Sequence, residues 1–224
     1  MSEHKWPRTY HLPFSPGLQN DDRRHPDLKV FEGRRVIVSE KMDGEGATMT
    51  SERTYPRSPD GRWHPSRGRM KTFHAERAHS IPEKWRVSGE YMYALHSVPY
   101  LRSNGNALPS WFLGFGVWDE NNVLLSWDDT LDWFALLDIV PARVLYDGPW
   151  NEDCIRKIAE GLDPNRQEGL VVRLAESIAY PEGRGDAGRF FRGVAKWVRK
   201  GHVQTDEHWQ KNWRDEPGWV NELA

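Results

Sequence analysis

The succession of short strand-like runs, several without a helix between them, most constrains what this chain can fold into. The runs with strand character are Val36–Glu40, Ala47–Ser51, Trp85–Tyr91, Trp111–Trp118, Val123–Leu125, Arg143–Tyr146, Gly169–Leu174 and Arg189–Val198. Helical patterns cover Thr72–His79, Ser126–Leu137, Glu152–Gly161 and Asp206–Trp213. Consecutive strands with helices between only some of them favour antiparallel sheets over a doubly wound parallel sheet. The pattern predicts an α+β fold with flanking helices.

The chain is expected to form one domain over residues 1–224, because it has no internal repeat and no low-complexity linker. The core is expected at about residues 30–203, after an irregular lead-in and before a helical C-terminal tail at 204–224. The mean hydropathy is low, −0.80. The 12 Trp, 7 Tyr and 8 Phe nevertheless supply enough large rings to build a core.

The sequence carries no sign of export or membrane insertion. It has no apolar run of 18 residues, and the segment Met1–Pro7 lacks the apolar stretch of a signal peptide. A single cysteine, Cys154, excludes an internal disulfide and fits a reducing compartment. We expect a cytoplasmic protein that does not contact a membrane.

The charge is balanced overall but uneven along the chain. Lys and Arg total 31 against 33 Asp and Glu, which argues against a protein that coats nucleic acid nonspecifically. Basic residues concentrate at positions 53–71, taken as a long surface loop, and at 184–202. Two basic stretches in a neutral protein suggest one positive face that meets phosphates, although each could also be a solvated loop.

The segment Glu40–Gly44 follows the apolar run Val36–Val38 and could present a primary amine, that of Lys41, to a phosphate. The pair Asp43-Gly44 favours a tight turn, because glycine tolerates positive φ and aspartate can bond to its own backbone. The residues from Ala47 are then expected to form the returning strand. Alone, this short pattern would occur often by chance.

Four later segments accompany it in a fixed order. Glu90 ends the run Arg86–Tyr91, Phe112–Asp119 is aromatic-rich, Glu168 opens a buried run, and cationic side chains follow Val194 up to Lys200. Together with the lysine segment they resemble the ordered motifs of the covalent lysine nucleotidyltransferase superfamily of polynucleotide ligases and capping enzymes. Within it, the chain is most similar to ATP-dependent RNA ligases over roughly residues 36 to 200. The resemblance implies an ATP-grasp-like nucleotidyltransferase domain.

The resemblance implies that Lys41 is the nucleophile that takes AMP from ATP as a lysine phosphoramidate. A lysine of ordinary pKa, about 10.4, is almost fully protonated at neutral pH and must lose a proton to attack. Lys196 and Lys200 are expected to supply the positive field that lowers the pKa of Lys41, and to hold the triphosphate.

The same resemblance assigns further roles. It implies that Glu40 positions adenine, Arg57 touches phosphate, Glu90 holds the ribose, Trp118 stacks on adenine with Phe115 as the fallback, and Glu168 helps to hold Mg or Mn. RNA is expected to bind through Arg62, Arg67, Arg69 and Arg199. Each of these residues also has a structural interpretation, as a strand-end charge, a core ring or a loop cation. The nine histidines show no zinc-ligand spacing with cysteine.

The implied function is an ATP-dependent RNA ligase that joins 5′-phosphate and 3′-hydroxyl RNA ends through a lysine–AMP intermediate and an adenylated RNA end. Three alternatives stay open: a minimal DNA ligase, a capping guanylyltransferase that uses GTP, and a nucleic-acid-binding module without catalysis.

Two features depart from the family pattern. The last motif usually carries two lysines separated by one residue, and here Val198 holds the second position. Arg199 or Lys200 is expected to compensate through a local bulge. The residues after Lys200 are too few for the OB-fold or helical domain that many relatives append. A minimal catalytic domain is therefore expected, with an accessory protein as a candidate partner.

Overall fold

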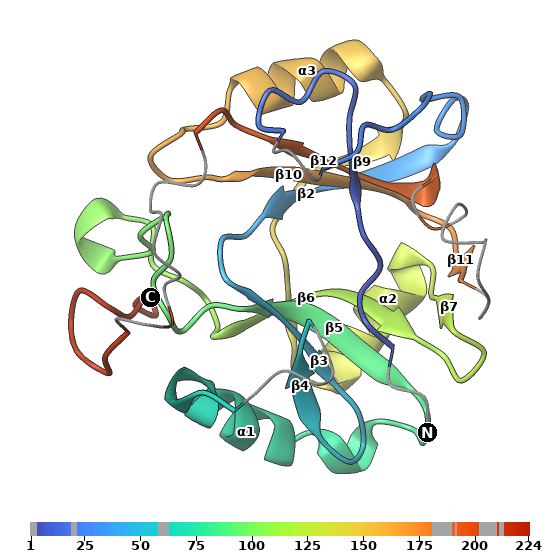
Figure 1. The fold of residues 1–224 in the computed structure, drawn as a ribbon. Helices are drawn as coiled ribbons and strands as arrows, with labels where there is room; N and C mark the ends of the chain where they lie inside the picture. The colour runs from blue at the N-terminus through green and yellow to red at the C-terminus, as the bar shows by residue number, and fades with distance from the viewer. Residues whose placement is uncertain are drawn as a thin grey trace.

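Two β-sheets face each other, with helices on their outer sides (Figure 1). The computed structural model describes residues 4–18, 22–57, 63–180, 190, 192–201, 210 and 213–224. In Figure 1 helix α3 (Glu152–Glu160) lies above the first sheet and helix α1 (Gly68–Ala75) below the second. This arrangement confirms the predicted α+β fold with antiparallel sheets and flanking helices. Among the described residues, no helix is both long enough and apolar enough to cross a membrane.

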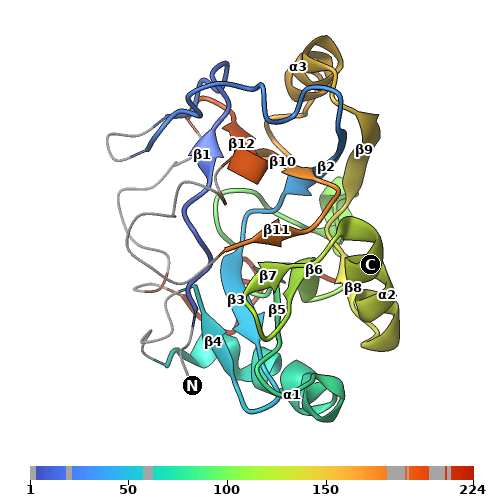
Figure 2. The same ribbon diagram turned by 90° about the vertical axis from the view of Figure 1, so that its right-hand side faces the viewer.

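Sheet A has five strands, in the order β1-β12-β10-β2-β9. Their bounds are β1 Tyr10–His11, β2 Arg35–Lys41, β9 Val144–Pro149, β10 Gly169–Leu174 and β12 Val194–Val198. All neighbours pair antiparallel except β1, which runs parallel to β12. Figure 2 shows β1 beside β12 at the edge of this sheet.

Sheet B follows the order β11-β7-β6-β5-β3-β4, with β8 parallel to β6. The bounds are β3 Glu45–Met49, β4 Thr54–Pro56, β5 Arg86–Tyr91, β6 Phe112–Trp118, β7 Val123–Leu124, β8 Val140–Pro141 and β11 Ile178–Ala179. Helix α2 spans Trp127–Leu136. Short 3₁₀ turns lie at Pro65–Arg67, Ala78–Ser80 and Arg102–Asn104.

Alternation along most of β2 separates a core face from a cavity face. Val36 and Val38 on β2 pack with Ile155 of α3 in one buried cluster. The alternate residues Ser39 and Lys41 line a cavity instead. Because side chains of a strand point to opposite faces in turn, burying the valines against α3 directs Lys41 to the space between the sheets.

Sheet B has its own core on the face covered by α1 and α2. Met49, Val87 and Phe112 of the sheet cluster with Met70 of α1 and Phe134 of α2. The expected helix start at Ser126 is confirmed, because its side chain accepts from the Asp129 backbone N–H at 3.1 Å.

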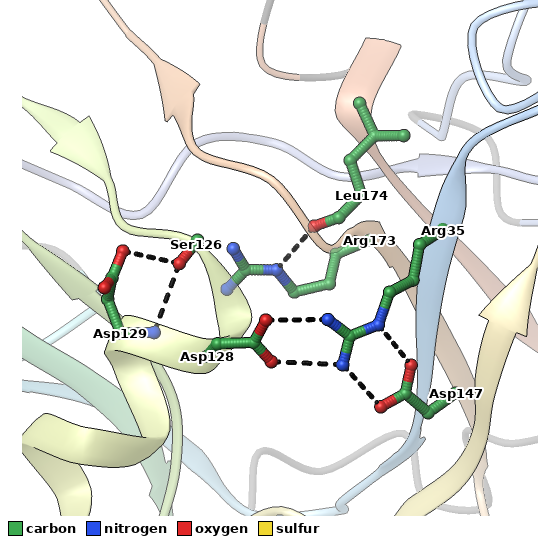
Figure 3. A network of polar contacts seen from close by, with 7 residues as sticks. All are labelled: Arg35, Ser126, Asp128, Asp129, Asp147, Arg173 and Leu174. Atoms are coloured by element: carbon green, nitrogen blue, oxygen red, sulfur yellow. Dashed lines mark hydrogen bonds and ion pairs between the residues drawn. The ribbon is translucent and has the colours of Figure 1, made fainter.

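Arg35 at the start of β2 ties sheet A to helix α2 (Figure 3). Its guanidinium bonds to both oxygens of Asp147 on β9 (2.7 and 2.8 Å) and both oxygens of Asp128 on α2 (2.7 and 3.0 Å). Figure 3 also shows the buried Arg173 of β10, which donates from Nε to the Leu174 carbonyl at 3.1 Å. Its Nη2 donates to the carbonyl of Leu125, just before α2, at 2.6 Å. These contacts connect the two layers at the end of β2 away from Lys41.

The expected returning strand was wrong in its pairing. Strand β3 occurs where it was predicted, but it pairs with β4 and β5 rather than with β2. Residues 42–44 therefore cross from sheet A to sheet B. Gly44 does not have positive φ; a Cβ there would instead lie 2.6 Å from the Tyr91 carbonyl oxygen. Glycine is needed for close approach to β5 rather than for a left-handed turn.

Helix boundaries were predicted less accurately near residue 70 than elsewhere. The helix expected at Thr72–His79 begins at Gly68 and ends at Ala75, and the stretch 53–71 holds β4 and the start of α1 as well as loop. The helix expected at Asp206–Trp213 falls largely outside the described residues. Residues 213–224 contain no helix and pair with the segment 92–108, at Ala94↔Val220 and Leu108↔Leu223.

Candidate active site

A cavity of about 860 Å³ lies between the sheets and contains most of the residues expected to act on a nucleotide. Strands β2, β3, β10 and β12 supply much of its wall, and individual residues of β4 to β7, of α2, of the segment before β2 and of the connecting loops complete it. The polar and charged side chains that line it include Arg8, Asp22, Glu40, Lys41, Glu45, Arg57, Arg67, Glu90, His96, Glu168, Arg173 and Lys196.

Lys41 at the end of β2 donates from Nζ to Glu168 Oε2. The register explains this contact, because Lys41 lies opposite Gly169 at the start of β10 and Glu168 precedes it. Burial alone would lower the pKa of Lys41, but the negative charges of Glu168, Glu90 and Asp43 raise it above its ordinary value. The sequence predicted that nearby lysines would lower the pKa of Lys41. In the structure, carboxylates raise it instead and keep the amine protonated.

Glu90, near the end of β5, lies close enough to Glu168 and Asp43 for their charges to affect its pKa. Burial is the largest cause and raises the pKa to about 8, while the charge of Lys41 and a bond from the Gly44 backbone N–H oppose the rise. At neutral pH this carboxyl is therefore largely protonated, which makes it a hydrogen-bond donor to a ligand hydroxyl.

Lys196 reaches the same cavity from β12 and pairs with Asp22, Nζ to Oδ1 at 3.1 Å. Burial lowers the pKa of Lys196, and the nearby positive charges of Lys41 and Arg57 add to that effect, against the stabilising bond from Asp22. Asp22 is in turn held by the fully buried His11 of β1, Nε2 to Oδ2 at 3.0 Å.

Glu40 is 6 % exposed and accepts from Gln167 Nε2 at 3.1 Å, with Arg143 Nη1 at 3.8 Å from the same oxygen. Burial raises its pKa, and these polar neighbours oppose the rise. Gln167 directly precedes Glu168. Two adjacent residues just before β10 therefore bond to two adjacent side chains of β2, those of Glu40 and Lys41.

Of the two aromatic residues expected to stack on adenine, Phe115 lines the cavity and Trp118 does not; Trp6 and Trp127 line it as well. Trp118 is 1 % exposed and lies in the core, where its ring stacks on Phe190 with centroids 5.6 Å apart. Phe115 of β6 and Val171 of β10 line the cavity from the two different sheets. The assignment of adenine stacking to Trp118 is therefore not supported by its position, and the fallback Phe115 has the exposure that stacking requires.

The cations expected to bind RNA lie in different settings. Arg67 lines the cavity and forms a two-bond pair with Glu45, with Nε to Oε2 at 2.7 Å. Arg69 lies over the Tyr93 ring at 4.6 Å on the surface of α1. Arg199 donates to the Gly201 carbonyl at 3.4 Å, outside the cavity lining. Arg62 lies outside the described residues.

The bulge expected near Val198 is absent from the described strands. The pairing of β12 with β10 is regular from Val194 to Val198, and Val198 itself lines the cavity. Lys200 is exposed and lies outside the lining, so neither it nor Arg199 takes the second lysine position. Arg57, as expected, lines the cavity after β4.

Sequence reasoning missed the contribution of the first 30 residues. Arg8, Thr9 and Asp22 line the cavity, although their segment had been interpreted as an irregular lead-in. The His11–Asp22 pair had no recognisable sequence signal. It forms where residues 23–25 pair with the backbone of His11, and β12 then brings Lys196 to Asp22. Gln167 could have been suspected from its position beside Glu168.

The described part of the chain contains no group of three or more His, Cys, Asp or Glu side chains arranged to hold a metal ion. Mg²⁺ commonly binds through one or two carboxylates together with substrate phosphates and waters. Glu168, 8 % exposed at the cavity, fits that kind of site.

The two facing sheets of mostly antiparallel strands, with their flanking helices, match the fold of nucleotidyltransferase-type ligases. A sequence profile described as RNA ligase matches residues 34–198, and the chain belongs to this family. A search of curated proteins finds no match.

Several solved structures share the fold at low sequence identity. An archaeal ATP-dependent RNA ligase in two crystal forms has TM-scores of 0.56 and 0.57 at 16 % identity, over 88 % and 87 % of this chain and 48 % of that chain. A Naegleria gruberi RNA ligase with pyrophosphate has a TM-score of 0.52 at 18 % identity, over 78 % of this chain and 52 % of that chain. This chain thus spans about half the length of these ligases.

Proposed function

We propose that this protein is an ATP-dependent RNA ligase that uses Lys41 as its nucleophile. The observation that carries the proposal is the meeting of Lys41, Glu168 and Lys196 in one cavity, although their strands are far apart in sequence. This is the juxtaposition that the ordered motifs imply. The family match and the ATP-dependent RNA ligases of the same fold support it.

In the first step the Lys41 amine attacks the α-phosphorus of ATP, a P–N bond forms, and the P–O bond to pyrophosphate breaks. The ammonium must first lose a proton, and Glu168 is the group already bonded to it. When phosphates enter the cavity, Lys196 and Arg57 offset their charge, and their own positive field favours the neutral form of Lys41.

Phe115 and Val171 hold the adenine between the two sheets, and Glu90 donates to a ribose hydroxyl. Glu168 would hold a divalent metal, which supplies positive charge to the phosphates when bound. Solved relatives of the same fold include a Naegleria gruberi RNA ligase with ATP and Mn.

In the second step AMP passes from Lys41 to the 5′-phosphate of an RNA end. A 3′-hydroxyl then attacks that phosphate and AMP leaves, which joins the ends. Basic residues at the cavity mouth, among them Arg57, contact the RNA backbone. Binding through phosphates weakens as salt increases, so sealing should be slower at high ionic strength.

The test is incubation with ATP labelled at the α-phosphate and Mg²⁺ or Mn²⁺, followed by a denaturing gel. We expect label on the protein, its removal by added pyrophosphate, and its loss in Lys41→Ala but not in Lys157→Ala, a control on the exposed side of α3. Intact mass would reveal protein that is already adenylated. No label on unadenylated protein with any metal or nucleotide contradicts the proposal.

A second measurement separates the substrate classes. The labelled protein is offered nicked duplexes whose 3′ ends are either ribose or deoxyribose. Preferential sealing of the ribose end supports an RNA ligase, whereas equal or better sealing of the deoxyribose end indicates a DNA ligase.

A further inference from the structure

Asp43, two residues after the nucleophile, is fixed by the segment 98–100. Its backbone N–H donates to the Tyr100 hydroxyl at 3.1 Å, and its Oδ2 accepts from the Val98 N–H at 2.6 Å. Asp43 lies in the middle of the crossing between the two sheets, where neither β2 nor β3 holds the backbone. These two bonds therefore set where the crossing runs.

Tyr100 is itself held by Asn221. The Tyr100 N–H donates to Asn221 Oδ1 at 3.1 Å, and Asn221 Nδ2 donates to the carbonyls of Met92 and Ala94 at 2.7 and 3.2 Å. Asn221 is 2 % exposed and Tyr100 is 1 % exposed. Because all the polar atoms of this amide are used in a dry environment, the side chain has one arrangement available to it.

Backbone hydrogen bonds also join residues 221–222 to the segment 93–100. Asn221 N–H donates to the Tyr93 carbonyl at 2.9 Å, and Glu222 N–H donates to the Tyr100 carbonyl at 2.8 Å. Met42, next to Lys41, packs in the same apolar cluster as Tyr100, with Leu223 against it. Polar and apolar contacts thus link residues 221–223 to the crossing after β2.

We propose that Asn221 and Tyr100 are positioning residues for Lys41, acting through Asp43. Residues 221–223 hold the segment 98–100, which holds the crossing and so fixes the direction of the Lys41 amine. Small displacements of a nucleophile reduce the rate of attack strongly even when binding is unchanged. The inference rests on the proposed function for its kinetic consequence, whereas the linkage itself can be measured without ATP.

The kinetic test compares Tyr100→Phe, Asn221→Ala and the double variant in single-turnover adenylation of Lys41 at varied ATP. Tyr100→Phe removes only the hydroxyl that accepts from Asp43. We expect each single variant to slow the maximal rate roughly tenfold with little change in the ATP concentration at half-maximal rate. Since both act through one linkage, the double variant should be about as slow as either alone rather than slower by the product.

Tyr146→Phe is the matched control, because its hydroxyl bonds to the Pro149 carbonyl on β9, at the other edge of sheet A. It should adenylate at the wild-type rate. Unchanged rates in Tyr100→Phe and Asn221→Ala, or losses that multiply in the double variant, overturn the proposal.

Amide hydrogen exchange tests the contacts from Asn221 through Tyr100 to Asp43 directly. It applies even if the wild-type protein is not adenylated by ATP. Exchange of the Asp43 N–H should be slow in the wild type and in Tyr146→Phe, and faster in both Tyr100→Phe and Asn221→Ala. Asn221 is buried, so its replacement also affects overall stability, and Tyr100→Phe is therefore the deciding variant. Exchange of core amides in β2 reports overall stability and serves as the reference. Unaltered exchange at Asp43 in Tyr100→Phe contradicts the proposal whatever the activity.

Discussion

The amine of Lys41 is bonded to the carboxylate of Glu168 from the neighbouring strand before any nucleotide is present. The negative charge of Glu168 raises the pKa of Lys41 and so keeps its amine protonated. In the proposed reaction Lys41 must therefore lose a proton before its amine can attack.

The first prediction concerns the pH dependence of adenylation. Carboxylates raise the pKa of Lys41, so the reactive neutral amine becomes more abundant as pH rises. Glu90→Gln removes the carboxyl whose own titration near pH 8 would overlap with this trend, so in that variant kcat/KM for ATP should rise about tenfold per pH unit between about pH 7.5 and 9.5. A plateau below pH 8 would show that the free-enzyme amine is already neutral and that Glu168 does not hold its proton.

The second prediction concerns stability. Burial raises the pKa of Glu90 to about 8 in the folded protein, well above the ordinary range of a glutamate, so the folded state binds a proton that the unfolded state has released. The free energy of unfolding therefore decreases as pH rises from about 5 towards 8, because the folded state must keep or lose a proton on Glu90 that the unfolded state gives up more easily. Glu90→Gln should gain stability relative to wild type over that window, on the order of 3 kcal/mol.

Urea unfolding at several pH values measures this difference. Glu160→Gln, an exposed change at the end of α3, is the control and should show no such trend. A Glu90→Gln stability that runs parallel to wild type across the window would contradict the raised pKa.

The third prediction separates the two aromatic residues of β6. Phe115→Ala should keep the fold and weaken ATP binding by about 1–3 kcal/mol, the usual size of a base-stacking contact. Trp118→Ala should unfold the protein more easily, by about 3–5 kcal/mol, since it empties a fully buried site. Denaturant midpoints and ATP titrations of both variants distinguish these outcomes; a stable Trp118→Ala that fails to bind ATP would restore Trp118 as the stacking residue.

The fourth prediction concerns the crossing between the sheets. In Gly44→Ala the added Cβ would meet the Tyr91 carbonyl oxygen at 2.6 Å and Met92 Sδ at 2.7 Å. We expect a loss of about 1–3 kcal/mol in stability and a strong loss of adenylation, because the crossing must move.

Gly68→Ala is the matched control: nothing lies within 4 Å of its Cβ position, and alanine at this helical site should stabilise by about 0.5–1 kcal/mol. Wild-type adenylation in Gly44→Ala would show that the position tolerates a side chain.

The meeting of Lys41, Glu90 and Glu168 in one cavity could be expected because their segments, in order, resemble the motifs of a known family. Lys41, Glu90 and Glu168 are found near strand ends, where alternation between core and solvent stops and a polar side chain can enter a cavity. Helices α2 and α3 were predicted to within about a residue, since their N-caps, Ser126 and Asn151, precede clear acidic first turns.

The remaining features depend on pairings that leave no local trace. Strand β3 follows β2 as a hairpin strand would, and only the partners of β3 in sheet B show that the chain changes sheets. Strand β6 is apolar on both faces, so its sequence cannot show whether Phe115 or Trp118 meets the cavity. The irregular pairing of β5 with β6 after Ser88 obscures the alternation further.

The parallel pairing of β1 with β12 has a practical consequence for anyone shortening this protein. Strand β1 covers the outer edge of sheet A, and the segment that follows it brings Asp22 to Lys196. Trimming residues 10–22 would uncover a row of unpaired backbone groups and, in the same cut, leave a half-buried ammonium without its counter-ion. Self-association and a damaged phosphate site would then arise together, and an inactive, aggregating truncation would say little about the chemistry of Lys41.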